Sequence, residues 1–403
     1  MMPIQWASES SDRRDDPVSG ARIIQLTSAA AISNNIYGEQ PCSSPDGQRV
    51  AIARCQDFCW DEEGSLLVHE LDRLRITMVT RRMKMKGLRS VCVFNAAWSG
   101  LVYYWTPDRK LMQLSLTTLE QREVYAEDDP AVPLPAGSVS PDQRYVLGFA
   151  PRLEGPGSPV FQVLRLDLQK KVREVIFEHP EIYNPHQQFN PVHGNQILLQ
   201  NNVGVRLNQD GSLDRSREAG CKLFAIDPDG RNQRYVPAGP PITHGITGHE
   251  CFVADTGRVL FTAGYMMPSD YDWRHDPLHP RGNLFTARPG DEQPTLFEAP
   301  EHKFNHVSAS RCGRYFVADS HTGPGMFANG RFRPVALVIG NLQTGKHRVL
   351  VENTEGSTGG NQCTHTHPYL TADNRYVIYN ADPHGIPQVF AAKIPPGFLE
   401  GLA

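Results

Sequence analysis

A short pattern repeats along the chain and constrains its fold more than any other feature. Each copy is a turn rich in Asp, Gly and Pro, then a basic or polar residue, then an apolar run suited to a strand. Such turns close hairpins, and aromatic or β-branched runs form the strands that follow them. Successive copies are about 55 residues apart, and the turns lie at Ser44–Gly47, Thr106–Asp108, Ser140–Asp142, Asn190–Gly194, Ala254–Gly257, Arg311–Gly313 and Thr371–Asn374.

The repeat predicts an all-β fold, and more specifically a seven-bladed β-propeller. Further strand-like runs lie between the copies, whereas helical periodicity is scarce. A sheet of about four strands in every ~50 residues is typical of a propeller blade. Two β-sandwiches with unrelated turns are the alternative. Because no linker divides the chain, we predict one propeller domain over residues 16–403, after a poorly ordered segment at 1–15.

Composition argues against a nucleic-acid-binding or membrane protein and indicates where in the cell the protein is expected. Among 403 residues, 40 Lys+Arg and 44 Asp+Glu give a net charge of −4, which argues against a nucleic-acid binder. No apolar run is long enough to cross a membrane, so no membrane partner is expected. The polar N-terminus lacks the apolar core of a secretory signal, and we expect the eight cysteines to be reduced. The sequence therefore predicts a cytoplasmic protein and leaves its oligomeric state open.

Histidines are concentrated in the second half of the chain, where three segments stand out. Of the 15 histidines, all but His69 lie beyond residue 178. His365 and His367 are two residues apart, so on an extended strand they point to the same side, and Gln362 adds an oxygen donor. Two imidazoles and an oxygen suit a borderline divalent metal.

The other two segments occupy the equivalent place before the preceding turns of the repeat. His306 comes before the sixth turn and His249 before the fifth, so three successive blades are expected to send a histidine toward the same end of the channel. This common position favours a site over three unrelated structural histidines, which remain the alternative. Other polar residues near strand starts are candidates for substrate binding: His186, Gln188, Asn202, Lys222, Arg274 and Arg311.

Several of these segments, in this order, resemble the oligogalacturonate lyase family. The similarity extends from about Asp16 to Ala392, and its most specific part is His249, then His306, then the Gln-x-x-His-x-His motif that begins at Gln362. It also includes the opening Asp16–Thr27, the Ser44–Gly47 turn and the His-x-Gln-Phe-x-Pro segment from His186. The resemblance implies a seven-bladed propeller, in agreement with the repeat.

The resemblance also implies an activity and roles for individual residues. The expected activity is that of a carbon–oxygen lyase that cleaves short uronic-acid oligosaccharides by β-elimination. The family's divalent metal, most commonly Mn²⁺, would be held by His306, Gln362, His365 and His367, and His249 would be the Brønsted base. Lys222 stands where the family has an assisting Arg, and Gln200-Asn201-Asn202 replaces a His-Glu-Gly segment. These departures concern the identity of the substrate more than the metal.

The chemistry of elimination agrees with these residue types. The proton at C5 of a uronide is weakly acidic, and a metal on the neighbouring carboxylate would offset the charge that develops when the proton leaves. A neutral imidazole is suited to accept that proton. Lys222 is the second predicted catalytic residue, which could pair with a substrate carboxylate or stabilise the developing charge. No Gly-x-Ser-x-Gly motif supports a serine hydrolase. Two alternatives stay open, namely a lyase for another uronoside, such as a glucuronate-containing glycan, and a non-catalytic glycan- or protein-binding propeller.

Overall fold

The fold is described from a computed structural model that carries side chains. It describes residues 4–403 except 38–39, 57–62, 86–91, 216–220, 265–274, 277, 279–280, 322–326, 329–330, 333–334 and 357–361. The described residues divide into two compact units, one within Met1–Glu123 and Glu301–Ala403 and the other within Val124–Met267 and Asp272–Pro300. The single domain expected for residues 16–403 stays a prediction.

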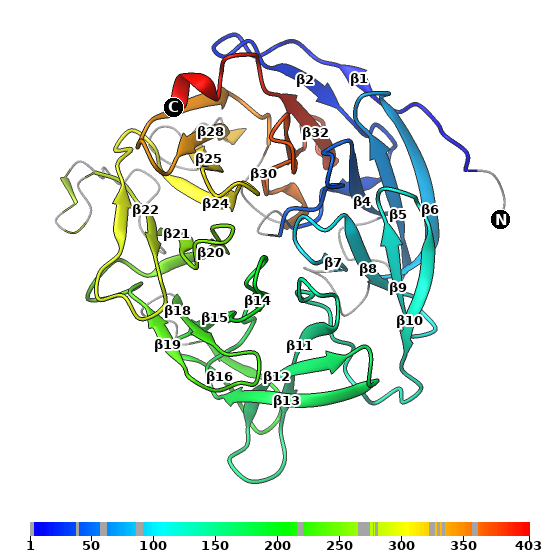
Figure 1. Ribbon diagram of the computed structural model, residues 1–403, viewed down its shortest axis with the longest axis vertical. Coiled ribbons are helices and arrows are strands. Elements are labelled where there is room, and N and C mark those ends of the chain that lie inside the picture. The colour runs from blue at the N-terminus through cyan, green and yellow to red at the C-terminus, as the bar shows by residue number, and fades with distance from the viewer. Residues whose placement is uncertain are drawn as a thin grey trace. The chain divides into compact units, whose positions relative to one another are not determined.

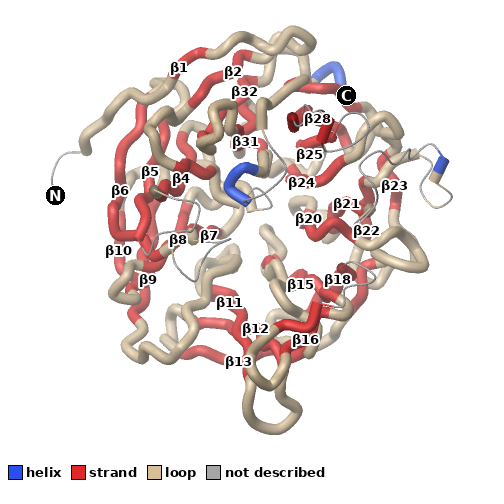
Figure 2. The backbone as a smooth tube through the Cα atoms, turned by 180° about the vertical axis from the view of Figure 1, so that it is seen from behind, coloured by secondary structure: helices blue, strands red, loops and turns tan. Residues whose placement is uncertain are grey.

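Regular structure in both units is almost entirely strand (Figures 1 and 2). Among the residues that the structure describes, helix is limited to short 3₁₀ turns such as η2 (Gln362–Thr364) and η3 (Glu400–Leu402). No helix in the described part of the chain is long and apolar enough to cross a membrane. The predicted all-β class is therefore confirmed.

The first unit contains antiparallel meanders in which consecutive strands pair. One is β3 (Ile32–Asn34), β4 (Arg49–Cys55), β5 (Glu63–Glu70) and β6 (Arg75–Lys84). The next is β7 (Val93–Asn95), β8 (Leu101–Trp105), β9 (Lys110–Ser115) and β10 (Gln121–Ala126). A third is β24 (Phe304–Ala309), β25 (Tyr315–His321), β28 (Val335–Asn341) and β29 (His347–Val351), with the small hairpin of β26 (Phe327–Ala328) and β27 (Arg331–Phe332) between its middle strands.

The last sheet of this unit joins the two ends of the chain. Its strands run in the order β1 (Ser11–Asp12), β2 (Arg22–Gln25), β32 (Gln388–Lys393), β31 (Tyr376–Ala381) and β30 (Tyr369–Leu370). Strand β2 is antiparallel to β32, with Ile23 opposite Ala392. Within the N-terminal segment 1–15, Ser11–Asp12 form β1, and the poor order expected for this segment stays a prediction.

The second unit repeats the same kind of meander. One sheet is β11 (Tyr145–Arg152), β12 (Val160–Asp167) and β13 (Val172–His179). The next is β14 (Gln188–Phe189), β15 (Ile197–Asn202), β18 (Cys221–Ile226) and β19 (Arg234–Val236), with the hairpin of β16 (Val205–Leu207) and β17 (Leu213–Arg215). The last is β20 (Ile246–Phe252), β21 (Val259–Ala263), β22 (Leu284–Ala287) and β23 (Thr295–Phe297), and β20 pairs with β18 of the neighbouring sheet at Ile246 and Cys221.

The sequence repeat is a recurring turn near the start of a sheet, except for the copy at Thr106–Asp108, which joins β8 to β9, the second and third strands of their sheet. In four copies the backbone N–H of the fourth turn residue donates to the carbonyl of the first, at 2.8 Å in Gly47–Ser44, Gln143–Ser140 and Asn374–Thr371 and at 3.0 Å in Gly313–Ser310. The hydroxyl of the first residue also accepts the N–H five residues later, from Arg49, Tyr145, Tyr315 and Tyr376. The turn chemistry read from the sequence therefore marks where six of the seven meanders begin, whereas the meander of β7 to β10 begins with an earlier turn, between β7 and β8.

Candidate metal centre

His306 reaches the candidate centre from an irregular part of β24. The pairing of β24 with β25 shifts between Phe304 and Val307, so the strand has a bulge at Asn305 and His306. Bulges are common next to active sites because they redirect a side chain. The His306 side chain is buried.

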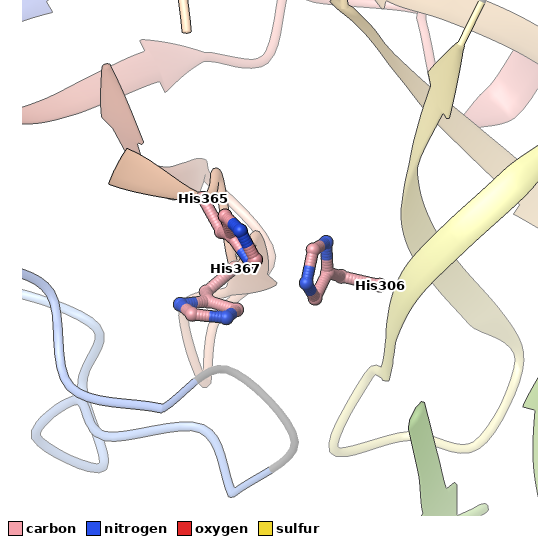
Figure 3. Close-up of side chains that lie close together, drawn as sticks. All are labelled: His306, His365 and His367. Atoms are coloured by element: carbon pink, nitrogen blue, oxygen red, sulfur yellow. The ribbon is translucent and has the colours of Figure 1, made fainter. Parts of the chain in front are cut away.

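His365 and His367 approach from the segment between η2 and β30. Figure 3 shows these two rings on one side and His306 on the other. The ring centroid of His306 is 5.1 Å from that of His365 and 4.6 Å from that of His367. One ligand atom from each of the three side chains lies within 4.8 Å of the others. Three imidazoles this close fit a borderline divalent metal such as Zn²⁺.

Asp319 on β25 orients His306. Its Oδ2 is 2.6 Å from His306 Nδ1, and its Oδ1 accepts the backbone N–H of the same residue at 2.7 Å. A carboxylate only accepts hydrogen bonds, so Nδ1 carries the proton and Nε2 keeps the lone pair that binds a metal. Thr366 Oγ1 also donates to Asp319 Oδ2, which joins the two segments that supply the histidines. The buried Asp319 is thus the outer partner that metal-binding histidines ordinarily have.

Two asparagines hold the backbone that carries His365 and His367. Asn380 Nδ2 donates to the His365 carbonyl at 3.0 Å, and Asn35 Nδ2 donates to the His367 carbonyl at 2.8 Å. Asn380 Oδ1 in turn accepts the Asn35 backbone N–H at 2.9 Å. His367 has a positive φ of 39°, an unusual conformation for a non-glycine residue that these bonds help to maintain.

The predicted ligand Gln362 begins η2, and its side chain lies outside the described part of the structure. Its role as a fourth ligand therefore stays a prediction. The structure brings together the other three predicted ligands, His306, His365 and His367. It adds Asp319, Thr366, Asn35 and Asn380, which were not identified from the sequence. A signal for two of them existed, since Asp319 and Asn380 each stand five residues after the basic residue that follows a repeat turn.

The predicted base His249 lies in the second unit, on a strand that repeats the irregularity of β24. The register of β20 shifts between Ile246 and Glu250, and His249 is half-buried within this bulged stretch. Gly248 has a φ of +96°, a value that favours glycine. His249 thus lies in the bulge of β20, just as His306 lies in the bulge of β24. Its role as the base stays a prediction.

Several predicted substrate-binding residues belong to a buried polar network around Glu250. Gln200 Nε2 donates to both Glu250 carboxylate oxygens at 3.0 and 2.9 Å and to the Gly248 carbonyl at 2.8 Å. Gln188 Nε2 donates to the Glu250 carbonyl at 2.8 Å, and His186 Nδ1 is 3.8 Å from Glu250 Oε1. Glu250 is fully buried and was not identified from the sequence.

The remaining predicted residues lie in different surroundings. Asn202 is buried, and its amide donates to the Tyr183 carbonyl at 2.6 Å. Lys222 is half-buried on β18, opposite Asn201 of β15. Arg311 is exposed in the turn between β24 and β25 and donates to the Pro45 carbonyl at 3.3 Å. Arg274 lies outside the described residues. The substrate roles of these four residues stay predictions.

Fold and site together define the class of protein, a propeller-type β protein with a cluster of three histidines, of which His306 and His367 are buried and His365 is half-buried. No family model matches the chain. It is 24% identical to an oligogalacturonide lyase of Pectobacterium atrosepticum and 23% identical to an oligogalacturonate lyase of Dickeya dadantii. Each alignment covers 94% of this chain and 95% of the relative.

Two solved structures share the fold over nearly the full length. An oligogalacturonate lyase in complex with manganese superposes with a TM-score of 0.67 at 19% identity, covering 99% of this chain and all of the other. The oligogalacturonate lyase of Vibrio parahaemolyticus gives a TM-score of 0.67 at 17% identity, covering 98% and 99%. The chain is a relative of the oligogalacturonate lyases, and the resemblance found in its sequence is confirmed.

Proposed function

We propose that this protein is a metal-dependent lyase that cleaves short uronic-acid oligosaccharides, such as oligogalacturonates, by β-elimination. The observation that carries the proposal is the cluster of His306, His365 and His367 with Asp319 behind it, in a chain related to oligogalacturonate lyases. The cytoplasmic location expected from the sequence belongs to the same proposal and stays a prediction.

The three imidazoles would hold a divalent cation, with Gln362 as the predicted fourth ligand. One relative was solved with manganese, so Mn²⁺ is the first ion to test. When bound, the cation would neutralise part of the charge that develops on the substrate carboxylate as the C5 proton leaves. Asp319 would keep the His306 Nε2 lone pair directed at the ion.

His249 is proposed as the general base. Its neutral imidazole would take the C5 proton, the C4–C5 double bond would form, and the C4–oxygen bond would break as the leaving sugar oxygen gains a proton. Lys222 is proposed to pair with a carboxylate of the substrate. A lysine is a point charge, whereas an arginine binds carboxylate in a bidentate manner, so the departure at Lys222 is a reason to test uronides other than galacturonate.

The test is the ultraviolet absorbance of the product. Elimination creates a C=C bond conjugated to the carboxylate, which the substrate lacks. Oligogalacturonates and glucuronate-containing oligosaccharides would be mixed with the Mn²⁺-loaded protein. We expect His249→Ala to lower the rate by about 10²- to 10⁴-fold, the range for loss of a general base.

The design includes matched variants. His365→Ala with His367→Ala should abolish both bound metal and activity, while the exposed His193→Ala should change neither. No absorbance rise with any uronide, in protein shown to hold metal, would exclude the lyase and leave the binding propeller. An unchanged rate in His249→Ala would show that another residue is the base.

A further inference from the structure

A second group of metal-binding side chains lies in the first unit, apart from the three-histidine cluster. Glu301 and His302 directly precede β24, the first strand of their sheet, and His347 begins β29, the last strand. One ligand atom from each of the three lies within 4.8 Å of the others. Glu301 Oε1 is 2.6 Å from His347 Nε2 and 3.9 Å from His302 Nε2, and the two rings meet edge to face at 5.4 Å.

Ser320 orients His302 in this group. His302 is buried, and its Nδ1 is 3.0 Å from Ser320 Oγ. When Ser320 accepts the Nδ1 proton, the lone pair lies on Nε2, the nitrogen that faces Glu301.

The two histidine groups are organised by adjacent residues of one strand. Asp319 bonds His306, and Ser320 bonds His302. Successive residues of a strand point to opposite faces of the sheet. Strand β25 thus supplies an outer partner to one histidine on each of its faces.

From this geometry we propose that Glu301, His302 and His347 form a second divalent-cation site of the zinc type. Two imidazoles and a carboxylate are a common set of protein ligands for Zn²⁺, and three ligands leave one position for water. Ligand atoms around tetrahedral zinc are about 3.3 Å apart, given bond lengths of about 2.0–2.2 Å. The contacts of 2.6 and 3.9 Å from Glu301 Oε1 lie on either side of that spacing, and all three ligand atoms lie within 4.8 Å of one another.

The position of the group indicates a structural role. A bound ion would tie the segment that leads into β24 to the start of β29, and so cross-link the first and last strands of one sheet. Because an ion that binds only the folded chain shifts the unfolding equilibrium, Zn²⁺ should raise the unfolding midpoint through this site. The alternative is that Glu301 and His347 form an ordinary ion pair without metal affinity.

Zinc stoichiometry distinguishes these cases without any activity assay. Full-length protein stripped of metal would be dialysed against Zn²⁺, and bound zinc would be measured by elemental analysis. We expect about two equivalents in the wild type, and about one in Glu301→Gln with His347→Ala and in His365→Ala with His367→Ala. The exposed His384→Ala should match the wild type.

The variants also separate failure of this site from failure of the proposed lyase. One equivalent in the wild type that Glu301→Gln with His347→Ala retains, or two equivalents in that variant, would overturn the second site while leaving the activity test unaffected. If the double variant does not fold, Glu301→Gln alone serves, because Glu301 is exposed and its replacement should preserve the fold. That single change should weaken zinc binding at this site by about tenfold or more, and unchanged affinity would overturn the proposal.

Discussion

At the scale of single residues, the candidate metal centre depends on a carboxylate that is not one of its predicted ligands. Asp319 is fully buried, which would be costly for a charge without partners. It accepts hydrogen bonds from His306 and Thr366. One buried acid therefore connects the strand that carries His306 to the segment that carries the other two imidazoles.

We predict that Asp319→Asn will lower the affinity for Mn²⁺ by about 10- to 100-fold, the effect typical of removing the outer partner of a metal-bound histidine. The amide has the same shape but carries no negative charge, and its NH₂ group favours the wrong tautomer of His306. Titration of metal-free protein with Mn²⁺ measures the effect. The exposed Asp255→Asn is the control, and equal affinities in the two variants would show that Asp319 does not position the ligand.

At the scale of elements, the short segment before β30 depends on side chains from β31 and from the stretch that follows β3. Asn380 on β31 donates to the His365 carbonyl, while its backbone N–H donates to the Thr366 carbonyl at 2.8 Å. Asn35 supplies the bond to His367. Irregular backbone needs such partners because buried carbonyl groups without hydrogen bonds are costly.

We predict that Asn380→Ala will destabilise the fold by about 1–3 kcal/mol, the cost of leaving buried polar groups without a partner. It should also weaken metal binding, because the backbone of His365 and His367 loses its support. Urea denaturation of the metal-free protein gives the first quantity, and Mn²⁺ titration gives the second. Asn353→Ala, at an exposed position, should cost much less. A fully stable variant with normal metal affinity would contradict this account.

At the scale of the whole molecule, the N-terminal segment links the last sheet of the first unit to its first sheet. Strand β1 pairs with β2, while Ala7 bridges Ile76 of β6 and Glu9 forms an ion pair with Arg54 of β4 at 2.6 Å. Ser10 Oγ lies 2.6 Å from His69 Nε2 and helps to cover this histidine of β5. Burial of His69 therefore depends on Ser10, a residue about 60 positions earlier in the chain.

Burial lowers the pKa of His69 to about 4, because a charged imidazole is disfavoured away from water. In the unfolded chain its pKa is about 6.5, so between these values the unfolded state binds a proton that the folded state does not. Stability should thus fall as the pH drops from about 6.5 to about 4 and should not fall further on account of this group. Between about pH 7 and pH 5 the loss from His69 should be about 2 kcal/mol.

Urea midpoints at these two pH values check the prediction in wild type, His69→Gln and the exposed His193→Gln. The His69 variant should lose less stability on acidification than the other two proteins. Parallel losses in all three would show that His69 is not the titrating group.

The sequence by itself determined the all-β class, the positions of most of the repeat turns and the three histidines of the candidate metal centre. Turns are local, because Ser, Asp and Gly bond to backbone only a few residues away, so they can be read from short segments. The His-x-His spacing and the common position of His306 before its turn are also local features. Asp319 and Asn380 each stand the same number of residues after a repeat turn. The sequence nevertheless does not show which distant residue the side chain of a polar strand residue will hydrogen-bond.

Only the tertiary structure decided which distant groups meet. The bond between Asp319 and Thr366, the support from Asn35, the buried pair of Gln200 with Glu250, and the cover of His69 by Ser10 all join residues far apart in sequence. The same holds for Glu301, His302 and His347, which come from the two outer edges of one sheet. Such contacts depend on strand register and on bulges, and a shift of one residue would turn each side chain to the opposite face.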